Sequence, residues 1–140
     1  MDQTEFRFST PLKVRIADIN YGNHVGNDSY IRFFHEGRMR YLNDLGVSEQ
    51  DIGDGVGLIL TEIHCELKAE LFYGEELIMY VRISGIERLR FTMEYQIVRS
   101  ENKILAAQGE TVMVAYNYVR RRPVAIPKSF LEKVKELEGL

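Results

Sequence analysis

A ten-residue stretch, DINYGNHVGN at positions 18–27, gathers side chains suited to acid–base chemistry. It holds one carboxylate, one imidazole and three amides, and the candidates among them are Asp18, His24, Asn20 and Asn27. A carboxylate or a neutral imidazole can take a proton from water, and an amide can polarise a carbonyl. Because the stretch is rich in Asn and Gly and lacks an apolar period, it is typical of a loop. These residue types make the loop a candidate site for acid–base chemistry.

The base of this loop is either Asp18 or His24 on the sequence alone. If the preceding strand continues far enough, Asp18 and Asn20 project to the same side. The alternative role for Asp18 is a turn in which its carboxylate holds the loop backbone. His24 can accept a proton or donate one, and its alternative role is that of a solvated polar side chain.

The loop leads into a predicted helix from Tyr30 to Leu45, which Gly46 ends. Free backbone N–H groups near Gly26, together with the helix dipole, could bind a developing oxyanion. The side chains that could instead cap these groups are Asn27, Asp28 and Ser29, and capping is the favoured role for Asp28.

The outward face of this helix carries Glu36, with Arg32 and Arg40 four residues away on either side. This spacing favours ion pairs over a role for Glu36 as an acid. The single cysteine, Cys65, falls on the apolar face of a strand and is expected in the core. No spacing of His and Cys matches a metal signature, so we predict no metal.

The remaining chain predicts an antiparallel sheet. Apolar residues alternate over 6–16, 59–71, 77–83, 89–97 and 104–119, and a short helix is expected over 130–137. Pro11 indicates an edge position or a bulge for the first strand. The fold class is therefore α+β, with one long helix packed on the sheet. Exposed edges predict at least a dimer.

Composition narrows the class of protein. The 140 residues fit one domain, 1–140, and 18 basic against 21 acidic residues give a net charge of −3. This balance argues against nucleic acid as a partner. No apolar stretch approaches the roughly 20 residues of a membrane span, and the N-terminus lacks signal-peptide features. We expect a soluble, cytoplasmic protein with no membrane partner.

Three segments resemble the hotdog-fold acyl-CoA thioesterases of the 4-hydroxybenzoyl-CoA thioesterase type. They are RIADINYGNHVGNDSYIRFFHEGRMRYL at 15–42, KAELFYGEEL at 68–77 and RRRPVAIP at 120–127. Their order fits the predicted elements over nearly the whole chain. The resemblance implies a hotdog fold, with an antiparallel sheet wrapped around one long central helix. It also implies a hydrolase that cleaves an acyl-CoA-type thioester to an acid and a thiol, as a homodimer or homotetramer.

The resemblance also assigns roles to residues. Water attack is expected to involve Asp18, Asn20, His24 and Asn27. The oxyanion is expected at the helix start, at Gly26 and Asp28. The substrate is expected to contact Tyr30, and its phosphates Arg88, Arg90 and Arg120. Glu36 is a less favoured acid. Coenzyme A enters as part of the substrate, with no separate cofactor.

Asn20 departs from the family pattern, because it stands where many members carry the catalytic Asp. An amide cannot take a proton from water or form an acyl anhydride. Another group must therefore activate the water. The departure keeps two rivals open: a non-catalytic hotdog protein that binds an acyl-thioester, and a hydratase or dehydratase on the same fold. A partner-binding module comes third.

Overall fold

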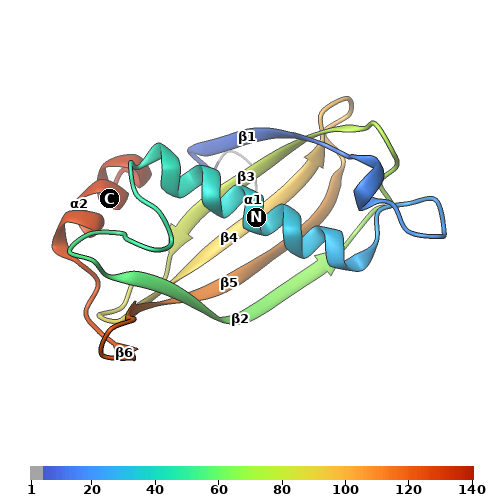
Figure 1. Cartoon of the computed structure of the whole chain (residues 1–140). Helices are drawn as coiled ribbons and strands as arrows, with labels where there is room; N and C mark the ends of the chain where they lie inside the picture. The colour runs from blue at the N-terminus through green and yellow to red at the C-terminus, as the bar shows by residue number, and fades with distance from the viewer. Residues whose placement is uncertain (1–4) are drawn as a thin grey trace.

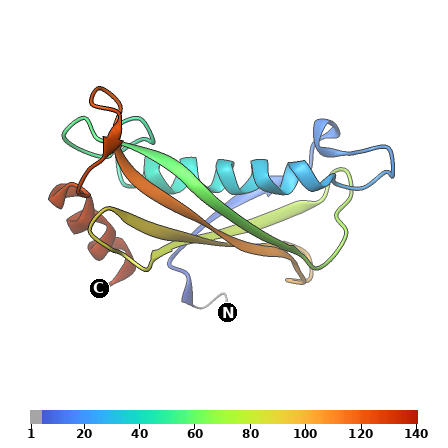
Figure 2. The same ribbon diagram turned by 90° about the horizontal axis from the view of Figure 1, so that it is seen from below.

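The computed structural model describes residues 5–140. One antiparallel sheet contains β1 (Phe8–Lys13), β3 (Glu76–Ser84), β4 (Arg90–Arg99), β5 (Leu105–Asn117) and β2 (Gly57–Leu67), in that order. A short β6 (Arg122–Pro123) pairs with β5. Figures 1 and 2 show α1 (Asn27–Asp44) lying along one face of the curved sheet. The predicted α+β architecture is confirmed, as is the edge position of the strand that contains Pro11.

Helix α1 packs on the sheet through an aromatic stripe. Tyr30, Phe34 and Tyr41 are buried, and the ring of Phe34 stacks on Tyr95 of β4 with centroids 4.5 Å apart. Burial of each such side chain contributes about 1.5–3 kcal/mol. Gly37 allows the close approach, because an ideal Cβ there would lie 2.8 Å from Cγ of Met79. This stripe is therefore the core face of α1.

Strand β2 forms the other edge of the sheet and contains a bulge. The pairing with β5 shifts between Leu60 and Glu62, so Leu58 faces the core and is 4% exposed. The prediction that Ile59 shares a face with Ile63 is wrong, because the extra residue of a bulge reverses the alternation. Ile63 and Leu67 are 46% and 49% exposed along this edge. The edge leaves apolar surface beside α1.

The far end of the molecule is closed by α2 (Lys128–Glu138). Its Phe130 packs on Phe91 with ring centroids 5.6 Å apart. The carboxylate of Glu138 accepts hydrogen bonds from the Tyr41 hydroxyl and from the Ile83 N–H. These contacts bind α2 to both α1 and β3. No helix within residues 5–140 has the length and apolar character needed to cross a membrane.

Candidate active site

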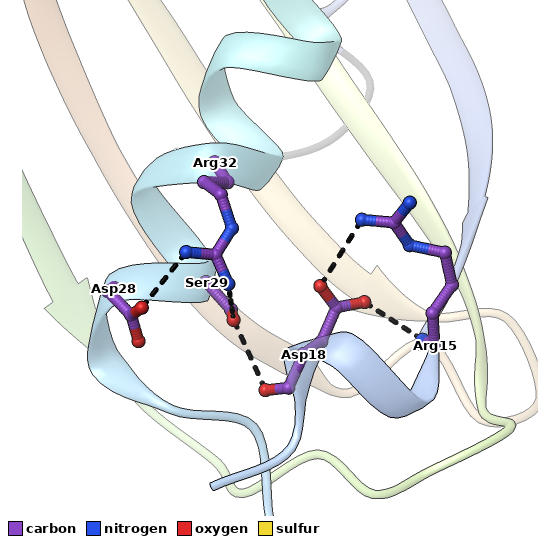
Figure 3. Close-up of polar contacts among 5 residues, drawn as sticks. All are labelled: Arg15, Asp18, Asp28, Ser29 and Arg32. Carbon is purple, nitrogen blue, oxygen red and sulfur yellow. Dashed lines mark hydrogen bonds and ion pairs between the residues drawn. The ribbon is translucent and has the colours of Figure 1, made fainter.

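Asp18 fastens the start of α1. It ends the short 3-10 helix η2 (Ile16–Asp18) and is 2% exposed. Its backbone carbonyl accepts the Gly26 N–H at 3.0 Å and the Ser29 hydroxyl at 3.1 Å. Figure 3 shows these side chains around the first turn of the helix. The end of the loop at Gly26 is therefore hydrogen-bonded to its first residue, Asp18, just before the helix starts.

The carboxylate of Asp18 is directed toward Arg15, three residues earlier. Oδ2 accepts the Arg15 N–H at 2.8 Å, and Oδ1 lies 3.5 Å from the Arg15 guanidinium. Within residues 5–140, Oδ1 has no hydrogen-bond donor. The expected turn role of Asp18 is thus present, with one carboxylate oxygen held by backbone.

Asn20 forms an Asx turn that fixes the direction of its amide. Oδ1 accepts the Gly22 N–H at 2.8 Å, and only the oxygen of an amide can do so. Nδ2 therefore points elsewhere. An ideal Cβ on Gly26 would lie 3.7 Å from Nδ2 and 3.4 Å from the Cβ of Asn20. A side-chain donor thus lies beside the start of the helix.

His24 lies near Gly22, close to the Asn20 turn. Its Nδ1 is 3.1 Å from the Val25 carbonyl oxygen, which can only accept, so Nδ1 carries the proton in this contact. The neutral ring then keeps Nε2 as an acceptor. An ideal Cβ on Gly22 would stand 3.0 Å from Nε2 and 3.3 Å from Asn20 Oδ1. The imidazole and the amide oxygen therefore both lie close to Gly22.

The start of α1 has no capping side chain of its own. Gly26 occupies the N-cap position, so the helix begins at Asn27, three residues before the predicted Tyr30. The prediction that Asn27, Asp28 or Ser29 caps the helix is wrong, because Gly26 takes that place. The first N–H groups of a helix have no intrahelical acceptor. The Ser29 N–H bonds the Gly26 carbonyl at 3.0 Å, and an ideal Cβ on Gly26 would lie 2.9 Å from Oδ1 of Asp28.

Asp28 and Glu36 are held in ion pairs on exposed parts of α1. Oδ2 of Asp28 accepts Arg32 at 2.9 Å, and this hydrogen bond lowers the pKa of Asp28. Glu36 accepts Arg40 at 2.9 Å, as predicted. Arg32 pairs with Asp28, so the expected pair of Arg32 with Glu36 is wrong. An ionised, paired Asp28 is a poor proton acceptor.

A cavity of about 230 Å³ joins the loop to strand β2. Its lining includes His24, Asn27, Tyr30 and Leu67. Tyr30 is 3% exposed and its hydroxyl donates to the Ala69 carbonyl at 3.3 Å. Three of the predicted site residues thus share one cavity at the open edge of the sheet.

The predicted phosphate ligands lie at the opposite end of the molecule from the loop. Arg88 is in the β3–β4 turn, Arg90 begins β4, and Arg120 is in the β5–β6 turn, near the C-terminal end of α1 (Figure 1). Arg90 is paired with Glu87 at 3.1 Å. A single chain does not bring these arginines to the His24 cavity.

The sequence interpretation missed a buried ion pair in the middle of α1. The Arg38 side chain is 7% exposed and bonds Glu49, and it also donates to the Tyr95 hydroxyl at 3.3 Å. Burial acts to lower the pKa of Arg38, but Tyr95 and Glu49 outweigh it and the pKa is raised. Its place between Phe34 and Tyr41 on the apolar stripe was the available signal.

The other titratable candidates stay outside the site. Burial raises the pKa of the Cys65 thiol, which suits a core residue better than a nucleophile. Among residues 5–140 no group of three or more His, Cys, Asp or Glu side chains is arranged to hold a metal ion.

The fold and the loop define a class of protein. The sequence model of the thioesterase-like superfamily matches residues 14–134, and the chain belongs to that superfamily. Its fold matches that of a 1,4-dihydroxy-2-naphthoyl-CoA thioesterase from Synechocystis with a TM-score of 0.85. The two are 23% identical, over 94% of this chain and 97% of that one. The hotdog fold and the family predicted from the three segments are confirmed.

Two curated relatives carry specific names. The acyl-CoA thioester hydrolase YbgC of Escherichia coli is 25% identical over 137 residues, which are 97% of this chain and 100% of that protein. The chloroplastic acyl-acyl carrier protein thioesterase ATL3 of Arabidopsis thaliana is 29% identical over 125 residues. That match covers 87% of this chain and 64% of the plant protein.

Proposed function

We propose that the protein hydrolyses acyl-CoA thioesters at the cavity beside the start of α1. One observation carries the proposal: the Nε2 acceptor of His24 and the Asn20 amide both lie close to Gly22, just before a helix start that has no capping side chain. Family membership supports the reaction class, and the name of the Escherichia coli relative supports CoA as the carrier.

His24 is the base in this proposal. Its Nδ1–H is held by the Val25 carbonyl, so Nε2 can take a proton from water. Asp18 is less suited, because Oδ2 already accepts a backbone N–H and the residue is 2% exposed. The hydroxide equivalent forms a bond to the thioester carbon. The C–S bond then breaks, and the imidazolium returns its proton to the leaving thiolate.

The negative oxygen of the intermediate needs donors that are already in place. The Nδ2 group of Asn20 and the N–H groups of Asn27 and Asp28 supply them, aided by the helix dipole. Asn20 therefore acts as a donor, which explains how an amide serves at a position where relatives use a carboxylate.

A second copy of the chain would complete the cavity. Strand β2 is an edge with exposed Ile63 and Leu67, and an unpaired edge of this kind favours strand pairing. We propose a homodimer or homotetramer. Arg88, Arg90 and Arg120 could serve a neighbouring site only across such an interface. The cytoplasmic location and the absence of a separate cofactor stay predictions from the sequence.

Thiol release tests the proposed function. Purified protein is incubated with short, long and aromatic acyl-CoAs, and free thiol is measured against a protein-free control. We expect hydrolysis of at least one class. Intact thioester with measurable binding would contradict the proposal in favour of a binding protein. Water addition to an enoyl-CoA without thiol release would point to a hydratase.

A further inference from the structure

The first turn of α1 carries a carboxylate next to the proposed oxyanion donors. An ideal Cβ on Gly26 would lie 2.9 Å from Oδ1 of Asp28 and 3.7 Å from Nδ2 of Asn20. The hydrogen bond from Arg32 lowers the pKa of Asp28, so this carboxylate is charged at neutral pH. A negative charge here opposes a second one that grows on the thioester oxygen nearby. The proposed site therefore needs a group that offsets the charge of Asp28.

Arg32 holds two side chains of this turn with one guanidinium. Its Nη1 donates to Oδ2 of Asp28 at 2.9 Å, from four residues further along the helix. Its Nη2 donates to the hydroxyl oxygen of Ser29 at 2.7 Å. Figure 3 shows the guanidinium between these two side chains. Because the guanidinium is a planar, rigid fork, the positions of the carboxylate and the hydroxyl are set together.

Ser29 extends this restraint to the catalytic loop. A guanidinium N–H can only donate, so the Ser29 oxygen accepts from Arg32 and its single O–H is left to donate. That O–H donates to the Asp18 carbonyl at 3.1 Å, and the same carbonyl accepts the Gly26 N–H at 3.0 Å. Ser29 and Asp18 are 1% and 2% exposed. A continuous chain of hydrogen bonds therefore runs from Arg32 to the end of the loop.

We propose that Arg32 is a positioning residue for hydrolysis, which offsets the charge of Asp28 beside the oxyanion and holds the loop through Ser29. The inference rests on the proposed thioesterase function. Side chains that are 51% and 78% exposed form an ion pair of little value to stability, so folding alone gives this pair no strong role. A charge beside the reacting oxygen acts instead on the transition state, and the effect is expected in kcat.

A double-substitution cycle separates charge from packing. We expect Arg32→Gln to lower kcat about tenfold and to change KM less than about twofold, because the charge of Asp28 then stands unopposed. Adding Asp28→Asn to this variant should return kcat to within about threefold of wild type, since no charge remains to be offset. Arg32→Lys should keep about half of kcat, because it retains the positive charge. Arg40→Gln is the matched control: it removes the equivalent exposed pair with Glu36 and should keep kcat within about twofold.

A wild-type kcat in Arg32→Gln would overturn the inference while leaving hydrolysis intact, and so would a double variant no faster than Arg32→Gln. Calorimetry with benzoate tests the charge without catalysis, because its carboxylate carries a negative oxygen as the intermediate does. We expect benzoate to bind Arg32→Gln about tenfold more weakly than wild type, and to regain affinity in the double variant. Equal affinity in wild type and Arg32→Gln, including no binding by either, would overturn the inference. Thiol release decides separately on the proposed function.

Discussion

The two ends of helix α1 differ: the N-terminal end lies beside the His24 cavity, and the C-terminal end packs against α2. At its C-terminal end, the N–H groups of Leu45, Gly46 and Val47 bond the carbonyls of the last turn. Gly46 has a φ of 78°, which suits glycine at this position. Tyr41 and Glu138 then tie the same end to α2.

The N-terminal end of α1 has no comparable cap. Gly26 stands where a Ser, Thr, Asp or Asn would satisfy the first N–H groups. Ser29, a polar side chain that could have capped the helix, donates its hydroxyl to the Asp18 carbonyl instead. The last turn of α1 is thus closed by backbone hydrogen bonds, whereas the N-cap residue at the first turn makes no side-chain hydrogen bond where a carbonyl is proposed to bind. The difference separates structural from chemical roles along a single element.

Asn20→Asp sharpens the comparison most. The new carboxylate keeps the Gly22 turn but loses the Nδ2 donor, so kcat should fall about 100- to 1,000-fold, as for loss of one oxyanion donor. Asn117→Asp is the matched control, because its Oδ1 accepts backbone N–H groups in a turn at the other end of the molecule. Steady-state thiol release measures both. A faster Asn20→Asp enzyme would show that a carboxylate base is preferred there.

Arg38→Met tests the structural role of the buried ion pair that α1 makes with Glu49. Removal of Arg38 leaves Glu49 without its buried partner, so the free energy of unfolding should fall by about 3–5 kcal/mol. Denaturant titration measures the loss, and the folded fraction should keep its kcat. Arg32→Met, on the exposed side of α1, should cost less than about 1 kcal/mol. A large loss of kcat in folded Arg38→Met would move this pair into the site.

Gly26→Ser introduces a capping side chain at the N-terminus of α1. The serine hydroxyl would compete for the first N–H groups and fill space beside Asn20, so kcat/KM should fall about tenfold. Unfolding free energy should change by only a few tenths of a kcal/mol, since Gly and Ser differ little as caps. Activity and thermal unfolding are measured on the same preparation. Unchanged activity would show that the helix start does not contact the substrate.

Local patterns predicted much of this molecule, and non-local contacts account for most of what they missed. Alternation located the strands, and Pro11 indicated an edge because proline cannot donate to a sheet. The bulge after Leu60 has no comparable local signal, so Ile59 was placed on the wrong face. Asn27, Asp28 and Ser29 all had the chemistry of caps, which hid Gly26 as the actual one.

The candidate site divides in the same way. The loop sequence gathered His24, Asn20 and Gly26, because residues so near in sequence are brought together by turns. It gave no direction for the Asn20 amide, which depends on the Gly22 contact. Arg38 and Glu49 lie 11 residues apart and meet only in the folded chain. The distance of Arg88, Arg90 and Arg120 from the loop likewise follows from topology.

Substitution of His24 tests the central claim most directly. Thiol release from the best acyl-CoA is compared for wild type, His24→Ala and His64→Ala, an exposed histidine on β2 outside the His24 cavity. We predict a fall in kcat of about 100- to 10,000-fold for His24→Ala and less than twofold for His64→Ala, with both variants folded. A His24→Ala variant that keeps the wild-type rate would contradict the account and return the role of base to Asp18.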